Sequence, residues 1–243
     1  AWGDNSAGQL GDGSSNVDRL SPVPMTGISD AVGIAAGNLH TLVTRAAGTV
    51  QATGLNSYGQ FGDGTITSQT QPVASGLLSN VVVVAARWHN SVAVTAGGVV
   101  LTCGVNEYGQ LGDGRVFHHD EAVRLSAVSP AKWIAAGNVH SLAGLTTGPL
   151  QSWGANWGLL GDGSAVCRTG IVAVAEQRNF VAGAAGAFHS AAVSSDGRVW
   201  TWGRGDAGQL GHGTLTNQFT PQAVSGLTGS TRVACGENYT LAL

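Results

Sequence analysis

The sequence is poor in charge. Only 10% of its 243 residues are charged, against about 25% in a typical soluble domain. Lys132 is the single lysine, the ten arginines are scattered along the chain, and the formal net charge is −3. A surface that binds a phosphate backbone needs clustered basic residues. The composition therefore argues against nucleic acid as a partner.

Cysteines and long apolar runs are also scarce. The three cysteines, Cys103, Cys167 and Cys235, are too few and too irregularly spaced for a disulfide framework or a Cys-x-x-Cys metal site, so we expect free and mostly buried thiols. No apolar run approaches the roughly 20 residues that span a bilayer; the most apolar segment, SNVVVVAA (79–86), has the length of a strand. We expect a soluble protein with no membrane insertion, and the composition leaves a cytoplasmic or a secreted location open.

Helical periodicity is missing, whereas glycine is abundant and regularly placed. No stretch keeps a 3.6-residue apolar period for ten residues without a glycine. The 38 glycines include Gly-Asp-Gly at 11–13, 62–64, 112–114 and 161–163 and Gly-His-Gly at 211–213, with spacings of 51, 50, 49 and 50 residues. Five copies of one unit therefore fill the chain.

A second signature recurs in the other half of each unit. It reads AAGNLHTL (35–42), AARWHNSV (85–92), AAGNVHSL (135–142), AAGAFHSA (184–191) and ACGENYTL (234–241). One slot is interpreted as holding His40, His89, His140 and His189, with Tyr239 in the last copy. Short alternating runs that follow tight-turn residues connect the two signatures and are typical of β-hairpins.

A unit of three or four short strands cannot bury both of its faces alone. Radial packing of such units gives a β-propeller. The sequence therefore predicts an all-β fold, a β-propeller of about five four-stranded blades forming a single domain over 1–243.

These residues resemble the regulator of chromosome condensation repeats. That family carries Trp-Gly-x-Asn, Gly-Gln-Leu-Gly-x-Gly and Ala-Ala-Gly-x-x-His-Ser/Thr, matched here by WGDNSAGQLGDG (2–13) and AAGNVHS (135–141). The resemblance covers essentially the whole chain and implies a propeller, usually of seven blades. Two alternatives stay open: a closed five-bladed ring whose last strand is supplied by Ala1-Trp2-Gly3, or a part of a longer, seven-bladed propeller.

The repeated polar residues are interpreted as structural. The histidine slot and Tyr239 are expected to form hydrogen bonds with backbone within or between blades, because a metal site would need close ligand spacing and supporting carboxylates. Asp12, Asp63, Asp113 and Asp162 lie one per unit between two glycines, where aspartate commonly bonds its own backbone. No nucleophile with a base and an orienting group is evident, so we predict no enzyme, no cofactor and no metal.

Departures from the repeat mark the candidate binding residues. The segment after Gly-Asp-Gly varies most, and loops on a rigid frame often carry function. Phe117, His118, His119, Asp120 and Glu121 form the strongest departure, followed by Arg19, Arg168 and Phe219. A solvated loop or a metal site are the alternatives for 118–121. The adhesion-like tripeptide Arg204-Gly205-Asp206 fills the slot of Asp4-Asn5-Ser6 in the first unit, so we interpret it as repeat drift.

The function predicted from these residues is a non-enzymatic protein-binding scaffold with a protein partner of unknown identity. A structural subunit of a larger assembly is one alternative. Guanine-nucleotide exchange on a small GTPase is the other, and it is implied by the resemblance alone. The units here have nearly constant length, without the inserted wedge or the basic tail of the family member with that activity.

Overall fold

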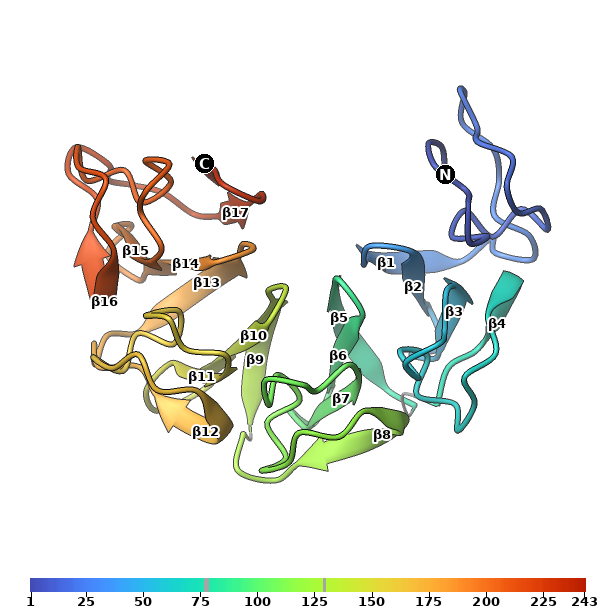
Figure 1. Ribbon diagram of the computed structural model, residues 1–243, viewed down its shortest axis with the longest axis horizontal. Coiled ribbons are helices and arrows are strands. Elements are labelled where there is room, and N and C mark those ends of the chain that lie inside the picture. The colour runs from blue at the N-terminus through green and yellow to red at the C-terminus, as the bar shows by residue number, and fades with distance from the viewer. Residues whose placement is uncertain (77–78, 129) are drawn as a thin grey trace. The chain divides into compact units, whose positions relative to one another are not determined.

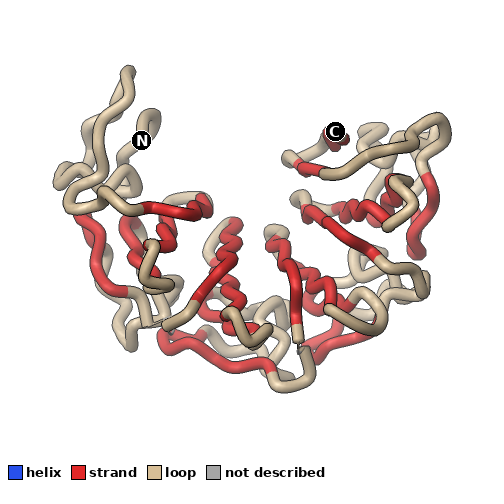
Figure 2. The backbone as a smooth tube through the Cα atoms, turned by 180° about the vertical axis from the view of Figure 1, so that it is seen from behind, coloured by secondary structure: helices blue, strands red, loops and turns tan. Residues whose placement is uncertain are grey.

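The computed structural model describes residues 1–76, 79–128 and 130–243. Within these ranges the chain consists of strands and loops and contains no helix (Figure 2). It follows that none of the described residues form a helix that could cross a membrane. The fold is a β-propeller whose blades are antiparallel four-stranded sheets, which confirms the predicted fold class.

The described residues form four four-stranded sheets and one two-stranded sheet (Figure 1). Each sheet is a meander in which neighbours in sequence are neighbours in space. The first comprises β1 (Ala31–Ala36), β2 (His40–Arg45), β3 (Val50–Gly54) and β4 (Gln69–Ala74), and the second β5 (Val81–Arg87), β6 (Asn90–Thr95), β7 (Val100–Gly104) and β8 (His119–Leu125). The third comprises β9 (Ala131–Ala136), β10 (His140–Leu145), β11 (Gln151–Gly154) and β12 (Arg168–Ala173), and the fourth β13 (Phe180–Ala185), β14 (His189–Ser194), β15 (Val199–Gly203) and β16 (Gln218–Ala223). The two-stranded sheet pairs β17 (Val233–Cys235) with β18 (Thr240–Ala242).

The sequence repeat and the blade are offset. A blade begins at the Ala-Ala signature of one repeat and ends after the Gly-Asp-Gly or Gly-His-Gly of the next. Five copies therefore yield four complete sheets, the two-stranded sheet of β17 and β18, and an N-terminal segment with the isolated bridge between Gly3 and Arg19. The segment that precedes β1 forms bonds within itself. Gly3 and Arg19 form a β-bridge, and the Ala1 amine donates to the Val23 carbonyl. Closure of a ring by Ala1-Trp2-Gly3 stays a prediction.

Glycine ends the third strand of each complete sheet because two backbones meet there. Gly154 has φ +111°, and a Cβ at this position would lie 2.5 Å from the Val139 carbonyl oxygen. An L side chain fits neither that dihedral nor that space. The strand therefore turns here into the long loop that carries Gly-Asp-Gly.

The chain forms two compact units, which we call unit 1 (Ala1–Asn106 with Phe117–Arg124) and unit 2 (Glu107–Val116 with Leu125–Leu243). The core of unit 1 gathers Leu42, Val50, Ala52, Phe61, Val81, Ala93, Leu101 and Cys103. The core of unit 2 gathers Ala135, Leu142, Leu150, Val174, Phe180, Ala185, Ala192, Trp200 and Trp202. The single-domain assignment of 1–243 stays a prediction.

Cysteine burial differs from the expectation in part. The three cysteines form no disulfide in the described part of the chain; Cys103 is buried, Cys167 is exposed and Cys235 is half-buried. The prediction of mostly buried thiols is therefore wrong for Cys167, which lies in a loop rather than a strand. Burial raises the pKa of the Cys103 thiol to about 12.

Candidate protein-interaction surface

An asparagine inside each of several long loops holds the loop in shape. In the fourth repeat, Asn156 Nδ2 donates to Asp162 Oδ1 (2.9 Å) and Ser164 Oγ (3.1 Å). Its Oδ1 accepts the backbone N–H groups of Gly158 (3.1 Å) and Leu160 (3.2 Å). Asn5 and Asn56 form the corresponding bonds in the first and second repeats. The loops between third and fourth strands are thus preorganised.

The repeated aspartates are part of the same loop frame. Asp12 Oδ1 accepts the Ser14 backbone N–H (3.0 Å) and hydroxyl (2.6 Å), and Oδ2 accepts Arg19 Nε (2.6 Å). The bonds from Ser14, and secondarily Arg19, hold the pKa of the Asp12 carboxyl well below its usual range. Asp63, Asp113 and Asp162 accept the N–H two residues ahead in the same way.

Two arginines predicted to contact a partner are engaged with these aspartates. Arg19 pairs with Asp12 at 2.6 Å, and Arg168 pairs with Asp162 at 3.3 Å. Each guanidinium therefore holds the loop from which it projects. A role of Arg19 or Arg168 in binding a partner stays a prediction.

In every repeat, one side chain later in the long loop accepts the backbone N–H of the residue in the asparagine position, which is Asn5, Asn56, Asn106, Asn156 and Gly205 in turn. The accepting chemical group differs from repeat to repeat. The acceptors are Asp18 (3.1 Å), Ser68 (3.1 Å), His118 Nδ1 (3.1 Å), Cys167 Sγ (3.4 Å) and Asn217 (3.0 Å). We call this position the acceptor slot. His118, predicted to bind a partner, is thereby assigned a structural contact with Asn106.

In the rest of the 117–121 segment, the Phe117 side chain is exposed to solvent, and the last three residues belong to β8. Phe117 exposes 72% of its surface. His119 begins β8, the Asp120 carbonyl accepts the Gly64 N–H at 2.8 Å, and Glu121 forms a β-bridge with Asp63. The described residues contain no group of three His, Cys, Asp or Glu side chains placed to hold a metal ion.

Three buried imidazoles lie between neighbouring blades. His40 Nε2 meets Ser91 Oγ (3.0 Å), His140 meets Ser190 (2.9 Å) and His189 meets Thr240 (3.0 Å). The three hydroxyls in turn donate to the carbonyls of Gln60, Leu159 and Gln209. The histidines thus bond a side-chain hydroxyl of the next blade, where we expected backbone. Burial, and secondarily the charge of His89, lowers the pKa of His40 to about 3.

The assignment of His89 to this slot is wrong. His40 pairs with Gly54 and His140 with Gly154 across their sheets, but Asn90 pairs with Gly104 in the second repeat. Asn90 therefore occupies the slot and His89 precedes it. The slot is the sixth residue of the signature in every copy, and in the second copy the histidine comes one residue earlier, in the turn from Arg87 to Asn90 where Trp88 adopts φ +46°. In the last copy Tyr239 holds the slot and is exposed.

His89 belongs instead to an aromatic cluster in unit 1. Its ring stacks on Tyr58 at 5.0 Å and lies 5.2 Å from the Trp88 ring, while His118 meets the edge of Tyr58 at 5.3 Å. We call Tyr58, Trp88, His89 and His118 the unit 1 cluster. It brings together the turn between β5 and β6, the loop between β3 and β4 and the loop between β7 and β8. In a four-stranded meander, the turn between the first two strands and the loop between the last two lie at the same end of the sheet.

A second aromatic cluster lies in unit 2. The rings of Tyr108 and Trp157 are 5.8 Å apart, those of Trp157 and Phe188 are 6.0 Å apart, and the Arg204 guanidinium lies 5.8 Å from the Phe188 ring centre. Trp157 remains 47% exposed and Tyr108 36%. We call these four residues the unit 2 cluster.

A hollow of about 230 Å³ opens at the unit 2 cluster, lined by Trp157, Leu159, Phe188, Arg204 and Asn217. Phe219, predicted to bind a partner, packs over Gly158 beside it and is 44% exposed. Arg204 also pairs with Asp206 at 2.6 Å. The charges of the Arg-Gly-Asp tripeptide therefore bond each other.

Our sequence reasoning missed both clusters. Their signal is the residue before one repeated glycine of each loop (Gly8, Gly59, Gly109, Gly158 and Gly208), which is Ala7, Tyr58, Tyr108, Trp157 and Ala207. Three aromatics in one slot stand out only when the slot is compared across repeats. Their partners, His89 and Phe188, come from the turn of the following blade.

Models of the regulator of chromosome condensation (RCC1) repeat match this chain. One matches residues 1–44, 97–143 and 196–243, and a second matches 31–60 and 180–209. Together the matches of the first model cover more than half of the sequence.

Curated relatives share these repeats. Human E3 ubiquitin-protein ligase HERC2 is 32% identical over 255 aligned residues, which is 100% of this chain and 5% of HERC2. Human protein RCC2 is 41% identical over 78 residues, 31% of this chain and 15% of RCC2. The chain therefore spans a small part of these relatives.

Solved structures share the fold. Human WBSCR16 superposes with a TM-score of 0.84 at 25% identity, covering 98% of this chain and 65% of that one. Prp20p of Saccharomyces cerevisiae, described with its binding to Gsp1p and histones, gives a TM-score of 0.83 at 23% identity, covering 99% and 63%.

Proposed function

Because the chain belongs to the regulator of chromosome condensation (RCC1) repeat family, we propose that it is a non-catalytic scaffold that binds another protein through its loop face. In each compact unit, the loop face is the side of the blades that carries the long loops and the aromatic cluster of that unit. Propeller proteins of this family bind proteins, as Prp20p does with Gsp1p and histones.

The observation that carries the proposal is the unit 2 cluster. Trp, Tyr and Arg are the residues most enriched among the dominant contacts of protein interfaces. Here Trp157 and Arg204 line one hollow, the Tyr108 ring lies 5.8 Å from the Trp157 ring, and all three side chains stay partly exposed. The loops that carry them are preorganised by the Asn156 network, which reduces the entropy lost on binding.

Site-specific photo-crosslinking tests this proposal. A benzoylphenylalanine at position 157 is compared with the same residue at Thr147, an exposed turn position between β10 and β11 at the other end of the blade. Irradiation in an extract of the source organism should yield one dominant protein adduct at 157 and none at 147. Equal adducts at both positions, or none at 157, would contradict the proposal.

Two variants refine the assignment. Tyr108→Ala should abolish the adduct at 157 if the partner engages the unit 2 cluster. Phe117→Ser removes the most exposed aromatic of the predicted 117–121 segment, and loss of the adduct in that variant alone would move the contact to unit 1.

A further inference from the structure

The hollow at the unit 2 cluster has aromatic walls. The Trp157 ring contacts both Tyr108 and Phe188, with ring centres 5.8 and 6.0 Å apart. Leu159, which is completely buried, adds an aliphatic surface to the lining. These walls favour a ligand with a compact apolar body that packs against ring faces.

The polar groups beside the rings are hydrogen-bond donors. Asn217 Oδ1 already accepts the Gly205 N–H at 3.0 Å, which leaves its Nδ2 group for a ligand. The Trp157 indole carries one N–H and no acceptor. Within the described part of the chain, neither Asn217 Nδ2 nor Trp157 Nε1 forms a hydrogen bond. A ligand that covers these groups must supply acceptors, because a donor that is buried without a partner is destabilising.

The cation at the hollow already has a counter-ion. Arg204 Nη2 and Nε lie 2.6 and 2.7 Å from Asp206 Oδ2. An acidic ligand would compete with Asp206 for the same guanidinium. The lining therefore suits a neutral ligand that combines an apolar body with acceptors.

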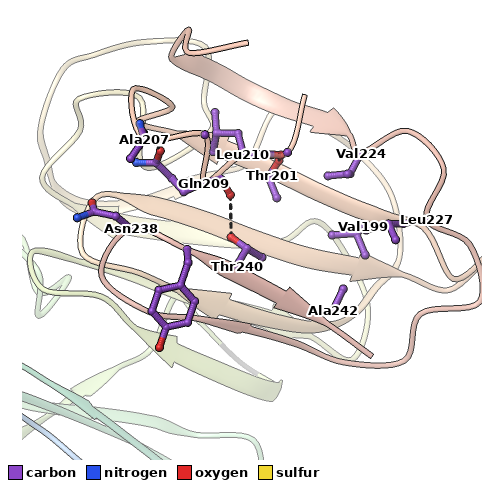
Figure 3. A pocket seen from close by; sticks show the side chains of 13 residues that line it. Val199, Thr201, Ala207, Gln209, Leu210, Val224, Leu227, Asn238, Thr240 and Ala242 are labelled. Carbon is purple, nitrogen blue, oxygen red and sulfur yellow. Dashed lines mark hydrogen bonds between the residues drawn. The ribbon is translucent and has the colours of Figure 1, made fainter. Parts of the chain in front are cut away.

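A second hollow in unit 2 is larger and differently lined. Its volume is about 280 Å³, and the long loop of the fifth repeat and β18 contribute to its lining (Figure 3). Of the described residues around it, Tyr239 alone is aromatic. Its two threonine hydroxyls already donate to backbone carbonyls, Thr240 to Gln209 at 2.9 Å (Figure 3) and Thr201 to Leu210 at 2.6 Å. The hollow at the unit 2 cluster differs in presenting several rings together.

We propose that the hollow at the unit 2 cluster binds a proline-rich segment of the partner protein in the polyproline II conformation. Proline carries an apolar ring and a carbonyl acceptor but has no N–H donor. Its rings pack on Tyr108 and Trp157, and Asn217 Nδ2 donates to a backbone carbonyl of the segment. This conformation is largely preformed, and aromatic-lined grooves are its usual docking surfaces. The inference rests on the proposed binding role of the loop face and adds the chemistry of the partner.

A decamer of proline is the probe, and the full chain labelled with fluorotryptophan reports its binding. The fluorine resonance of Trp157, assigned by its loss in Trp157→Phe, should shift saturably, whereas those of the buried Trp153 and Trp202 should stay. A decamer of alternating alanine and glutamine, equally uncharged, should bind about tenfold more weakly. Equal binding of the two decamers would overturn the proposal, and so would tighter binding of a glutamate decamer.

Two matched variants test the donor. Asn217→Asp keeps an oxygen for the Gly205 N–H, as Asp18 provides for Asn5 in the first repeat, and removes the amide donor. It should weaken binding of the proline decamer about tenfold. Ser68→Asp places the same charge in the acceptor slot of the second repeat and should leave binding unchanged. Equal effects of the two substitutions would contradict the assigned donor.

The binding role and the ligand chemistry can fail separately. With the photo-crosslinking residue moved to position 219, beside the hollow, Trp157 stays intact, and an excess of the proline decamer should suppress the adduct formed in the extract. An adduct that persists at saturating decamer would overturn this inference and leave the scaffold proposal standing. A shifted Trp157 resonance without any adduct would contradict the scaffold proposal and support the ligand chemistry.

Discussion

The turn between β5 and β6 and the turn between β9 and β10 occupy the same place in two successive repeats, yet they are built differently. The second turn runs from Gly137 to His140, and the imidazole bonds Ser190. The first runs from Arg87 to Asn90, and both amide atoms of the buried Asn90 side chain have no partner among the described residues.

The difference shows that glycine and histidine form one structural unit. A Cβ on Gly137 would lie 2.4 Å from His140 Cε1, and Gly37 and Gly186 meet their histidines equally closely. Where the slot holds the smaller Asn90, Arg87 stands in place of the glycine and pairs with Asn90 across the turn. The imidazole therefore imposes the glycine, and the two positions change together.

Gly137→Val should break the comparison most strongly. The added side chain overlaps the His140 ring and the Gly186 carbonyl, so we expect a loss of about 3 kcal/mol in the free energy of unfolding. Urea denaturation followed by tryptophan fluorescence measures it. Ala131→Val, in strand β9, which ends just before Gly137, is a control for the general cost of a valine in this region, and an equal loss in both variants would contradict the steric explanation.

His140→Ala should cost about 2–3 kcal/mol, because it leaves a buried cavity and removes one of the two hydrogen bonds of the Ser190 hydroxyl. The same denaturation experiment measures it. In a double-mutant cycle, the cost of Gly137→Val should fall sharply once His140 is alanine. Additive costs would show that the two residues are independent.

The buried histidine should make stability depend on pH. The pKa of folded His40 is about 3, below the value near 6.5 of an exposed histidine. Folding therefore favours the neutral ring, and its contribution is complete above about pH 6.5 and is lost as the pH falls toward 3, by about 1.4 kcal/mol per pH unit. Between pH 6.5 and 5 the unaltered chain should lose about 2 kcal/mol more than His40→Asn. Parallel pH profiles of the two proteins would refute this.

Asn90→Ala should have the smallest effect. The substitution removes two buried polar atoms without partners together with some packing, so we expect a change below about 1 kcal/mol. Thermal unfolding beside His140→Ala measures the contrast. A loss as large as that of His140→Ala would mean that Asn90 forms bonds equivalent to those of the histidine.

The sequence was sufficient to predict the fold class, because Gly-Asp-Gly, or Gly-His-Gly in the last copy, recurs wherever a third strand gives way to a long loop. The offset between repeat and blade was not predicted, since both signatures repeat with the same period. Asn90 is the sixth residue of the signature that begins at Ala85, as His40 is of the signature that begins at Ala35, so counting would have identified it. The slot was assigned to His89 instead because that residue is a histidine.

The interblade contacts could not be predicted from sequence. Whether His140 bonds backbone or a hydroxyl depends on Ser190, fifty residues away on another blade. The unit 2 cluster likewise depends on how the turn holding Phe188 approaches the loop holding Trp157. Spacing along the chain says nothing about such distances.

The acceptor slot separates the shape of a loop from its chemistry. A carboxylate, a hydroxyl, an imidazole, a thiol and an amide each satisfy the same backbone N–H, so what the loop requires is a lone pair at the right distance. Mutations can then exchange acidity, redox reactivity or proton affinity at this position while the backbone keeps its course. Such a position lets a lineage try new surface chemistry without first losing its fold.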